Sequence, residues 1–257
     1  MTIEKNKLKK YFDQNDGRLI HKWSHYFDIY EKHFNKYVGK EVVILEIGVF
    51  HGGSLRMWKD YFGSNAKIYG VDINPRCKEL EEEGIEIFIG SQSDRNFLRN
   101  LKTKIPPIDI LIDDGGHSMK QQIITFQELY SHVKNEGTYL CEDVHTSYEI
   151  AYGGGFKRRN TFIEFSKKLI DSLNAFHSEQ GALKENYFTK STESIHFYDS
   201  VVVFEKQMRS KPTDLKSGTP HFDSDGFEET TIQIIKRKIR VPISRVLRWF
   251  RFPSHLT

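Results

Sequence analysis

The chain has 257 residues, 38% of them hydrophobic and 28% charged, a composition typical of a soluble protein with one sizeable domain and an appendage. No apolar run is long enough to predict a membrane span, two cysteines are too few for a disulfide framework, and the charged N-terminus lacks the apolar core of a secretory signal. The formal net charge of +3 hides a basic tail, because residues 231–257 carry seven Lys or Arg and no acid. The rest of the chain is mildly acidic and gives no support for nucleic-acid binding, so we expect a cytoplasmic protein.

Strand-like and helical patterns alternate after a helical N-terminal segment, residues 1–40. Within that segment the aromatic spacing of residues 22–37 predicts an amphipathic helix. The expected strands then follow at 42–47, 66–71, 85–89, 108–112 and 138–142, and the expected helices at 54–61, 95–102, 118–133 and 161–175. Residues 194–205 predict two more strands around a turn near Asp199. The order predicts an α/β fold with βαβ units and a mainly parallel sheet. The family resemblance given below implies the finer architecture: a Rossmann-like, doubly wound, seven-stranded sheet with a C-terminal antiparallel hairpin and helical additions at both ends.

Four segments are expected along the chain. They are an N-terminal helical cap (1–40), a Rossmann-like domain (41–205), a polar linker rich in Pro and Gly (206–228) and a basic amphipathic tail (229–257). In the tail, residues 232–252 mix Trp249 and Phe250 with cations, and Pro242 should break any helix. Such a segment predicts contact with a membrane surface or a membrane-bound complex at the inner face of the membrane. The alternatives are homo-oligomerisation, docking on the body of the protein and disorder.

Glycines follow the first expected strand, where they permit a tight strand-to-helix turn and let a ligand approach the backbone. Phe50 stands in the place of the second glycine of a dinucleotide fingerprint, which disfavours a dinucleotide-dependent oxidoreductase. Glu46 suits a ligand with a cationic or amine end. Asp72, which ends the next strand, suits the two hydroxyls of a ribose. The loop reads Glu46-Ile-Gly48-Val-Phe50-His51-Gly52-Gly53-Ser54.

Acidic residues end two strands that we expect to be neighbours in the sheet. These residues are Asp113, Asp114, Glu142 and Asp143. Because crowded carboxylates repel one another, a divalent cation is expected among them. Oxygen ligands favour Mg²⁺, with Mn²⁺ or Ca²⁺ as alternatives. Alternation along the strand points Asp113 and Asp114 in opposite directions, so only one of the two is expected to bind metal.

His117 follows Asp114-Gly-Gly and is the expected general base. An imidazole can take a proton from a sugar hydroxyl group whose acidity a bound metal raises. His51 and His145 are expected either to orient a substrate or to cap a turn.

Tyr148 and Tyr152 belong to an aromatic, glycine-rich loop that continues through Gly153-Gly-Gly155. This loop is expected either to cover an acceptor, with both tyrosines and His145 as substrate contacts, or to be a plain connector.

Residues 20–205 resemble the class I S-adenosylmethionine-dependent methyltransferases. More narrowly, they resemble the metal-dependent sugar O-methyltransferases of macrolide and bacterial surface-polysaccharide pathways. The segments that carry the resemblance are 46–54, 113–117 and 142–145. The resemblance implies S-adenosylmethionine and Mg²⁺ (or Mn²⁺) as cofactors, and metal ligands Asp114, Glu142 and Asp143.

The same resemblance implies how the cofactor is held. Glu46 and Gly48 would flank its methionine part, Asp72 its ribose, and Gly90-Ser91-Gln92 its adenine. Gln92 is the expected adenine contact, since Ser91 stands where the family often has an acid. Lys22, Trp23, His25 and Tyr26 match a helix that covers the cofactor in relatives. The implied cofactor-binding residues are Glu46, Gly48, Phe50, Gly52, Ser54, Asp72, Gln92, Asp113 and Tyr26.

The function expected from the sequence is O-methylation of a sugar hydroxyl. The acceptor would be a bacterial surface polysaccharide, a nucleotide-linked sugar or a glycosylated metabolite. One alternative is methylation of a capsule substituent other than the sugar. The other is a non-catalytic scaffold that binds the cofactor within a glycan-assembly complex.

Overall fold

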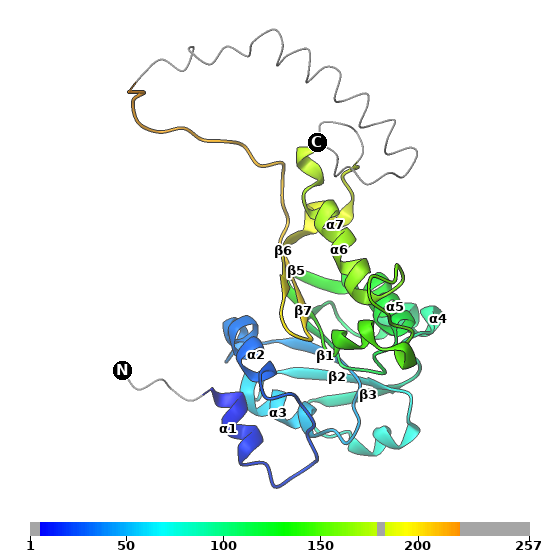
Figure 1. Cartoon of the computed structure of the whole chain (residues 1–257). Coiled ribbons are helices and arrows are strands. Elements are labelled where there is room, and N and C mark those ends of the chain that lie inside the picture. Colours follow the sequence, from blue (N-terminus) through cyan, green and yellow to red (C-terminus); the bar gives the residue numbers. More distant parts are fainter. Residues whose placement is uncertain (1–5, 179–182, 222–257) are drawn as a thin grey trace. The chain divides into compact units, whose positions relative to one another are not determined.

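The computed structural model describes residues 6–178 and 183–221 (Figure 1). Of these, residues 6–177 and 184–210 form one compact unit, which holds every helix and strand of the described residues. No described helix combines the length and the apolar character needed to cross a membrane. The basic tail expected at 229–257 lies outside the described residues, as does the end of the expected linker.

Seven strands form one sheet in the order β3-β2-β1-β4-β5-β7-β6 (Figure 1). They are β1 (Val43–Ile47), β2 (Lys67–Asp72), β3 (Ile85–Ile89), β4 (Ile108–Asp113), β5 (Val133–Cys141), β6 (Thr192–Phe197) and β7 (Val202–Lys206). Strands β1 to β5 pair in parallel, and β7 pairs antiparallel with both β5 and β6. The predicted Rossmann-like sheet with its terminal hairpin is confirmed. Since β1 lies between β2 and β4, the strand order reverses there, and a ligand crevice is expected at the carboxyl ends of these strands.

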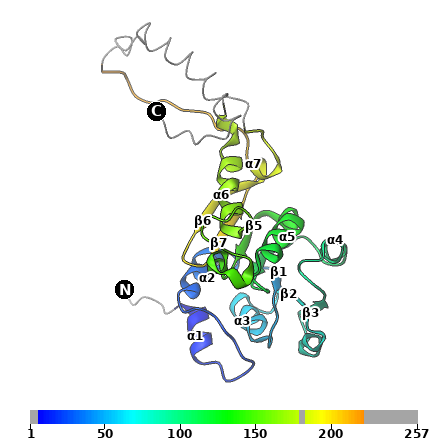
Figure 2. The ribbon, with the colours of Figure 1, turned by 45° about the vertical axis from the view of Figure 1, so that its right-hand side comes forward.

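Helices cover both faces of the sheet (Figures 1 and 2). They are α1 (Lys7–Asp13), α2 (Tyr26–Phe34), α3 (Gly53–Phe62), α4 (Arg95–Lys104), α5 (Met119–Leu129), α6 (Phe162–Leu173) and α7 (Tyr187–Ser191). Buried residues of α1, α2 and α3 pack against one face, and those of α4 to α7 pack against the other. Alternation along β1 sends Ile44 to the first core and Leu45 to the second. Glu46 therefore faces α3.

The N-terminal segment differs from the prediction that residues 22–37 form one helix. Helix α2 begins only at Tyr26, and residues 14–25, here called the strap, contain no helix. Asn15 starts the strap with a turn, because its side chain accepts a hydrogen bond from Gly17 N–H and donates one to Arg18 O. Lys22 is drawn into a cluster of carboxylates described below. Local turn chemistry and ion pairing therefore override the helical spacing of the aromatics.

Two further boundaries differ from the sequence prediction. Strand β5 begins at Val133 rather than 138, and its register with β4 shifts between Ile108 and Ile110. Glu136 in this stretch has a positive φ of 66° and is followed by Gly137, which hid the strand signal. The expected linker started at Lys206, but this residue ends β7 and is buried.

Glu205 ties β7 to α2 and should make stability depend on pH. Its carboxylate contacts His33 Nδ1 at 2.6 Å and accepts hydrogen bonds from Lys36 and Thr138, both at 2.8 Å. Burial alone would raise its pKa, but the hydrogen bonds from His33 and Lys36 hold the pKa below its ordinary value of 4.5. A depressed folded-state pKa stabilises at neutral pH, and that stability is lost as the pH falls through the folded value.

Glu205→Gln is therefore expected to lower the free energy of unfolding at pH 7 by about 1–3 kcal/mol and to flatten its decline in acid. Urea unfolding between pH 7 and pH 3 measures both effects. Glu193→Gln, an exposed substitution on the neighbouring β6, is the control. An unchanged slope of stability against pH in Glu205→Gln would contradict the assignment.

Candidate active site

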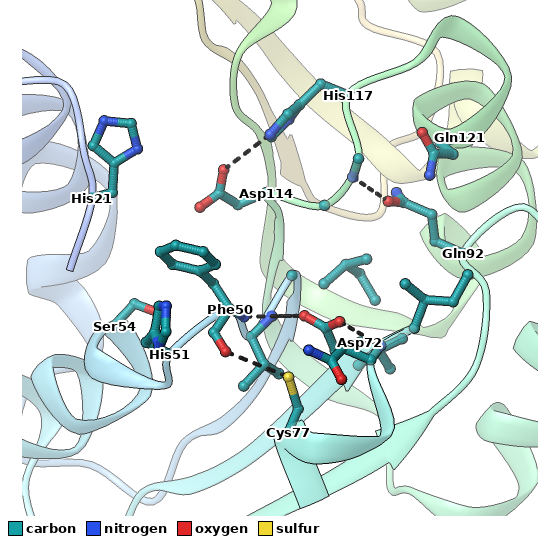
Figure 3. A pocket seen from close by; sticks show the side chains of 18 of the residues that line it. His21, Phe50, His51, Ser54, Asp72, Cys77, Gln92, Asp114, His117 and Gln121 are labelled. Carbon is teal, nitrogen blue, oxygen red and sulfur yellow. Dashed lines mark hydrogen bonds and ion pairs between the residues drawn. The ribbon is translucent and has the colours of Figure 1, made fainter. Parts of the chain in front are cut away.

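A cavity of about 450 Å³ opens at the carboxyl ends of β1, β2 and β4 (Figure 3). Residues Leu19–Lys22 of the strap form part of its wall. Twelve residues to which the sequence assigned a site role line it: Lys22, Gly48, Phe50, His51, Ser54, Asp72, Gly90, Ser91, Gln92, Asp114, His117 and Asp143. The predicted residues that do not line it include Glu46, Gly52, Asp113, Tyr26, Glu142, His145, Tyr148 and Tyr152. The sequence thus located the crevice, while several of its residues act from behind the cavity wall.

Gly48 lets the end of β1 pass directly beside the end of β4. Its φ is +98°, and a Cβ at this position would lie 2.0 Å from the backbone oxygen of Asp114. Any side chain would therefore combine backbone strain with overlap. Gly48→Ala is expected to destabilise the protein by about 2–5 kcal/mol and to abolish cofactor binding.

Gly63→Ala is a matched control for that prediction. Gly63 has the same φ of +98°, but nothing lies within 4 Å of its added Cβ. Gly63→Ala introduces the backbone strain without the steric overlap. Chemical unfolding should therefore show a clearly smaller loss of stability for Gly63→Ala than for Gly48→Ala. Equal losses in the two variants would refute the close approach at Gly48.

Asp72 holds the loop after β1. One carboxylate oxygen accepts hydrogen bonds from the backbone N–H groups of Val49 (2.9 Å) and Phe50 (3.0 Å), and the other accepts one from Asn74 N–H (2.8 Å). The oxygen that accepts from Asn74 keeps a further lone pair, and the carboxylate lines the cavity, as Figure 3 shows. Asp72 can therefore fix the loop and still accept a hydrogen bond from a ligand hydroxyl.

Gln92 and Asp113 form a buried support below the loop after β4. The Gln92 amide donates to Asp113 Oδ1 (2.9 Å) and accepts from Gly116 N–H (2.7 Å), so its side chain is used within the protein. Tyr139 donates to the other Asp113 oxygen, and burial raises the pKa of Asp113 to about 7. Asp113 thus points away from the cavity and Asp114 towards it, as strand alternation predicts. Both contacts position the loop that carries His117.

Three polar groups converge at one end of the cavity. Asp114, His117 and Asp143 each offer a ligand atom, and these atoms lie within 4.8 Å of one another. His117 Nε2 faces Asp143 Oδ2 at 3.5 Å and Asp114 Oδ1 at 4.0 Å. Thr146 fixes the loop by donating a hydrogen bond to the His117 carbonyl (2.9 Å). The fold therefore brings together the residues that follow β4 and β5: two carboxylates that could share a cation, and the imidazole of His117 beside them.

Lys22 neutralises the inner side of this acidic cluster. Its buried ammonium donates to Asp114 Oδ2 (2.5 Å) and to both oxygens of Glu142 (2.9 and 3.0 Å), and lies 3.6 Å from Glu46 Oε1. Burial would lower the pKa of Lys22, but the surrounding carboxylates raise it above its ordinary value. The sequence suggested that the crowded acids are unpaired. In the structure they are paired, because Lys22, 92 positions before Asp114, supplies a cation.

Glu46 and Glu142 lie behind the cavity wall with raised pKa values. For Glu142 the causes are burial and the charge of Asp114, while Lys22 and a hydrogen bond from Tyr30 (2.7 Å) oppose them. Burial raises the pKa of Glu46 to about 6, although Lys22 opposes it. Ser54 donates to Glu46 Oε2 (2.9 Å), and Oε1 has no hydrogen-bond partner within the described residues.

Three non-glycine residues at the site have left-handed backbone conformations. Phe50, His117 and Asp143 follow β1, β4 and β5, with φ of 51°, 55° and 52°. Such conformations cost about 1–3 kcal/mol each and persist where the surrounding structure enforces them. Their gathering at the carboxyl ends of three strands marks this crevice as a functional site.

The remaining predicted residues surround the cavity. Tyr26 donates a short hydrogen bond to Asp143 Oδ1 (2.6 Å), so it supports a carboxylate rather than lining the cavity. His145 contacts Ser200 and the Trp23 ring. The rings of Tyr148 and Tyr152 are partly exposed on the loop after β5.

Sequence reasoning missed the placement of the strap and several lining residues, among them His21, Cys77 and Gln121. One sequence feature that reflects the position of the strap is Gly53. A Cβ at this residue would lie 2.4 Å from the backbone oxygens of Arg18 and Leu19, so the strap requires a glycine here. The sequence alone identified Gly53 only as a turn residue.

Comparison with known proteins agrees with this fold. Residues 45–144 match the methyltransferase domain family. The chain is 35% identical over 205 residues to 8-demethyl-8-(2-methoxy-alpha-L-rhamnosyl)-tetracenomycin-C 3'-O-methyltransferase of Streptomyces olivaceus, which covers 74% of this chain and 51% of that protein. It is 34% identical over 207 residues to demethylmacrocin O-methyltransferase of Streptomyces fradiae, covering 75% and 52%.

Among solved structures, the chain resembles the MycE methyltransferase from the mycinamycin biosynthetic pathway, determined in complex with Mg, SAH and mycinamycin VI. The TM-score is 0.70 at 27% identity, over 91% of this chain and 58% of that one. The chain spans about half the length of the relatives named here. Residues 45–144 therefore resemble a methyltransferase domain, and the seven-stranded unit around them has the Rossmann-like methyltransferase fold.

Proposed function

We propose that this protein is an S-adenosylmethionine- and Mg²⁺-dependent O-methyltransferase that acts on a sugar hydroxyl of a glycosylated metabolite. The observation that carries the proposal is the convergence of Asp114, His117 and Asp143 in the cavity that also holds Asp72. A carboxylate pair beside an imidazole suits metal-assisted deprotonation of a hydroxyl. The name of the Streptomyces olivaceus relative, a 3'-O-methyltransferase of a rhamnosyl-tetracenomycin, supports the choice of a sugar acceptor.

The residues present fit the methyl donor. Asp72 offers a carboxylate oxygen to a ribose. Glu46 lies behind the cavity wall with its Oε1 3.6 Å from the Lys22 ammonium, and from there its negative charge would attract the amino group of a methionine moiety. The Phe50 ring is exposed beside the cavity, where an aromatic face attracts a sulfonium cation. Gln92 supports the loop through its own hydrogen bonds, so we assign it to the shape of the adenine pocket.

The residues also fit a divalent cation. Asp114 and Asp143 supply hard oxygen donors on the cavity side, and Glu142 is the third ligand expected from the sequence. When bound, Mg²⁺ would raise the acidity of a coordinated hydroxyl group. Mn²⁺ is the expected substitute.

His117 then has a defined task. Its Nε2 faces the two carboxylates, so a hydroxyl held at that end of the cavity lies within reach of the imidazole, which accepts the proton. Asp114 and Asp143 orient the imidazole and stabilise the cation that forms on it. The rest of the task is positioning, because an in-line methyl transfer needs only alignment of the acceptor oxygen with the methyl carbon.

The acceptor is the least constrained part of the proposal. The names of the relatives favour glycosylated metabolites over a surface polysaccharide or another capsule substituent. His145, Tyr148 and Tyr152 follow β5 close to Asp143, and we assign them to acceptor recognition.

The test is release of S-adenosylhomocysteine from S-adenosylmethionine, with a set of glycosides and the matching aglycones as acceptors. We expect turnover with glycosides, stimulation by Mg²⁺ and loss of activity in EDTA. Turnover that EDTA leaves unchanged would refute the metal-dependent mechanism. Binding of the cofactor without turnover on any acceptor would favour the scaffold alternative.

A further inference from the structure

Lys22 occupies the space between two carboxylates that the proposed function assigns to a metal ion. Its ammonium nitrogen is 2.5 Å from Asp114 Oδ2 and 2.9 Å from Glu142 Oε1. A divalent cation shared by the same two oxygens would need bonds of about 2.0–2.6 Å to each. Both cations would then bind the same two oxygens, and their mutual repulsion opposes joint occupancy.

We propose that Lys22 is a built-in competitor of the divalent cation, which binds between Asp114 and Glu142 only when the lysine side chain leaves. The inference rests on the metal dependence in the proposed function. It assigns Lys22 a role that neither the fold nor the predicted ligand set contains: this residue sets the affinity of the metal site.

The burial of Lys22 supports the inference. Its side chain is 2% exposed and lies among Glu46, Asp114 and Glu142, so it is the counter-cation that allows three acids to be close together in the absence of metal. A divalent cation would supply more positive charge to the same oxygens. Exchange of one cation for the other is therefore electrostatically feasible, whereas loss of Lys22 with no replacement is costly.

Exchange would also couple the metal site to the cavity wall. Lys22 ends the stretch of the strap that lines the cavity, and Arg18, further back along the strap, is held by a hydrogen bond to Leu80 O (2.9 Å). Departure of the Lys22 side chain must alter the wall formed by Leu19–Lys22. If metal binding changes the affinity for the cofactor through this wall, then cofactor binding must change the affinity for the metal by the same factor.

The first test is direct binding of Mn²⁺ to the full-length chain, measured by the loss of the free-ion signal in electron paramagnetic resonance. Lys22→Met keeps the length of the side chain and removes its charge, so it should bind Mn²⁺ at least about tenfold more tightly than the wild type. Lys22→Arg keeps the charge and should show no gain. Lys134→Met, which breaks the Lys134–Asp109 ion pair at the opposite end of β4, controls for loss of any lysine.

The second test uses the wild-type protein and so does not depend on the folding of a variant. Acetic anhydride labelling followed by mass spectrometry reports the accessibility of each lysine. Saturating Mn²⁺ should raise labelling of Lys22 several-fold. Lys206, a buried lysine held by Tyr130 O and Val133 O, should not change.

Unchanged or weaker Mn²⁺ binding by Lys22→Met, or unchanged Lys22 labelling, would overturn the inference while leaving a metal-dependent enzyme in place. Failure of the wild type and of Lys22→Met alike to bind Mn²⁺ would overturn both the inference and the metal dependence of the proposed function.

Discussion

Replacement of His117 by asparagine is expected to lower kcat by about 10²–10⁴-fold, because the variant lacks the group that accepts the hydroxyl proton. Asparagine tolerates a left-handed backbone, so the φ of 55° at this position should survive the substitution. The Gln92–Gly116 hydrogen bond that shapes the loop is independent of the imidazole. Affinity for S-adenosylhomocysteine should therefore stay within about threefold of the wild type, as measured by calorimetry.

His51→Asn is the matched control for this prediction. His51 also lines the cavity, but its ring packs edge-on against Phe50, with the centroids 4.2 Å apart, rather than facing the carboxylates. Its kcat should fall by less than about tenfold. Turnover by His117→Asn at the wild-type rate would remove His117 from the mechanism, and equal losses in the two variants would show that neither is the specific base.

Replacement of Asp114 by asparagine is expected to abolish Mg²⁺-stimulated turnover and to weaken Mn²⁺ binding by at least about 100-fold. Asp114 is the carboxylate that faces both His117 and Lys22, so the variant loses a metal ligand and disturbs the base in one step. S-adenosylhomocysteine release with and without Mg²⁺, together with Mn²⁺ titration, measures both effects.

Asp113→Asn provides a control at the adjacent position. The Asp113 side chain points to the opposite side and contacts Gln92 and Tyr139, so this variant should keep its affinity for Mn²⁺. Thermal unfolding of both variants separates loss of function from loss of fold. Retention of Mg²⁺-stimulated turnover by Asp114→Asn, or equal loss of Mn²⁺ affinity in both variants, would contradict the assigned ligand set.

Substitutions at Asp114 and Lys22 are expected to change metal affinity in opposite directions. Comparing the two variants therefore separates competition for the metal from a structural role of the ion pair. Loss of the carboxylate should weaken metal binding, and loss of the ammonium should strengthen it, although both substitutions remove one partner of the same ion pair. A purely structural role for the pair would weaken binding in both variants.

Local patterns in the sequence predicted most of the secondary structure and the position of the crevice. Hydrophobic alternation and glycine turns predicted all seven strands and the hairpin. Since parallel strands end at one edge of a sheet, the polar residues after β1, β2, β4 and β5 predicted the crevice. Asp113, Asp114, Glu142 and Asp143 were predicted at the crevice in this way, and the family resemblance then selected Asp114 as a ligand and supported His117 as the base.

Only the tertiary structure decided where the strap runs and which charges are paired. The aromatic spacing of residues 22–37 favoured a helix, but helical propensity is worth only tenths of a kcal/mol per residue, and buried ion pairing outweighs it. Lys22 is 92 residues from Asp114 and 120 from Glu142, and no local pattern encodes a contact at such separation. The sequence by itself therefore specified the chemical groups of the site, while the packing of the strap against α3 and the strand ends specified which cation lies among its acids.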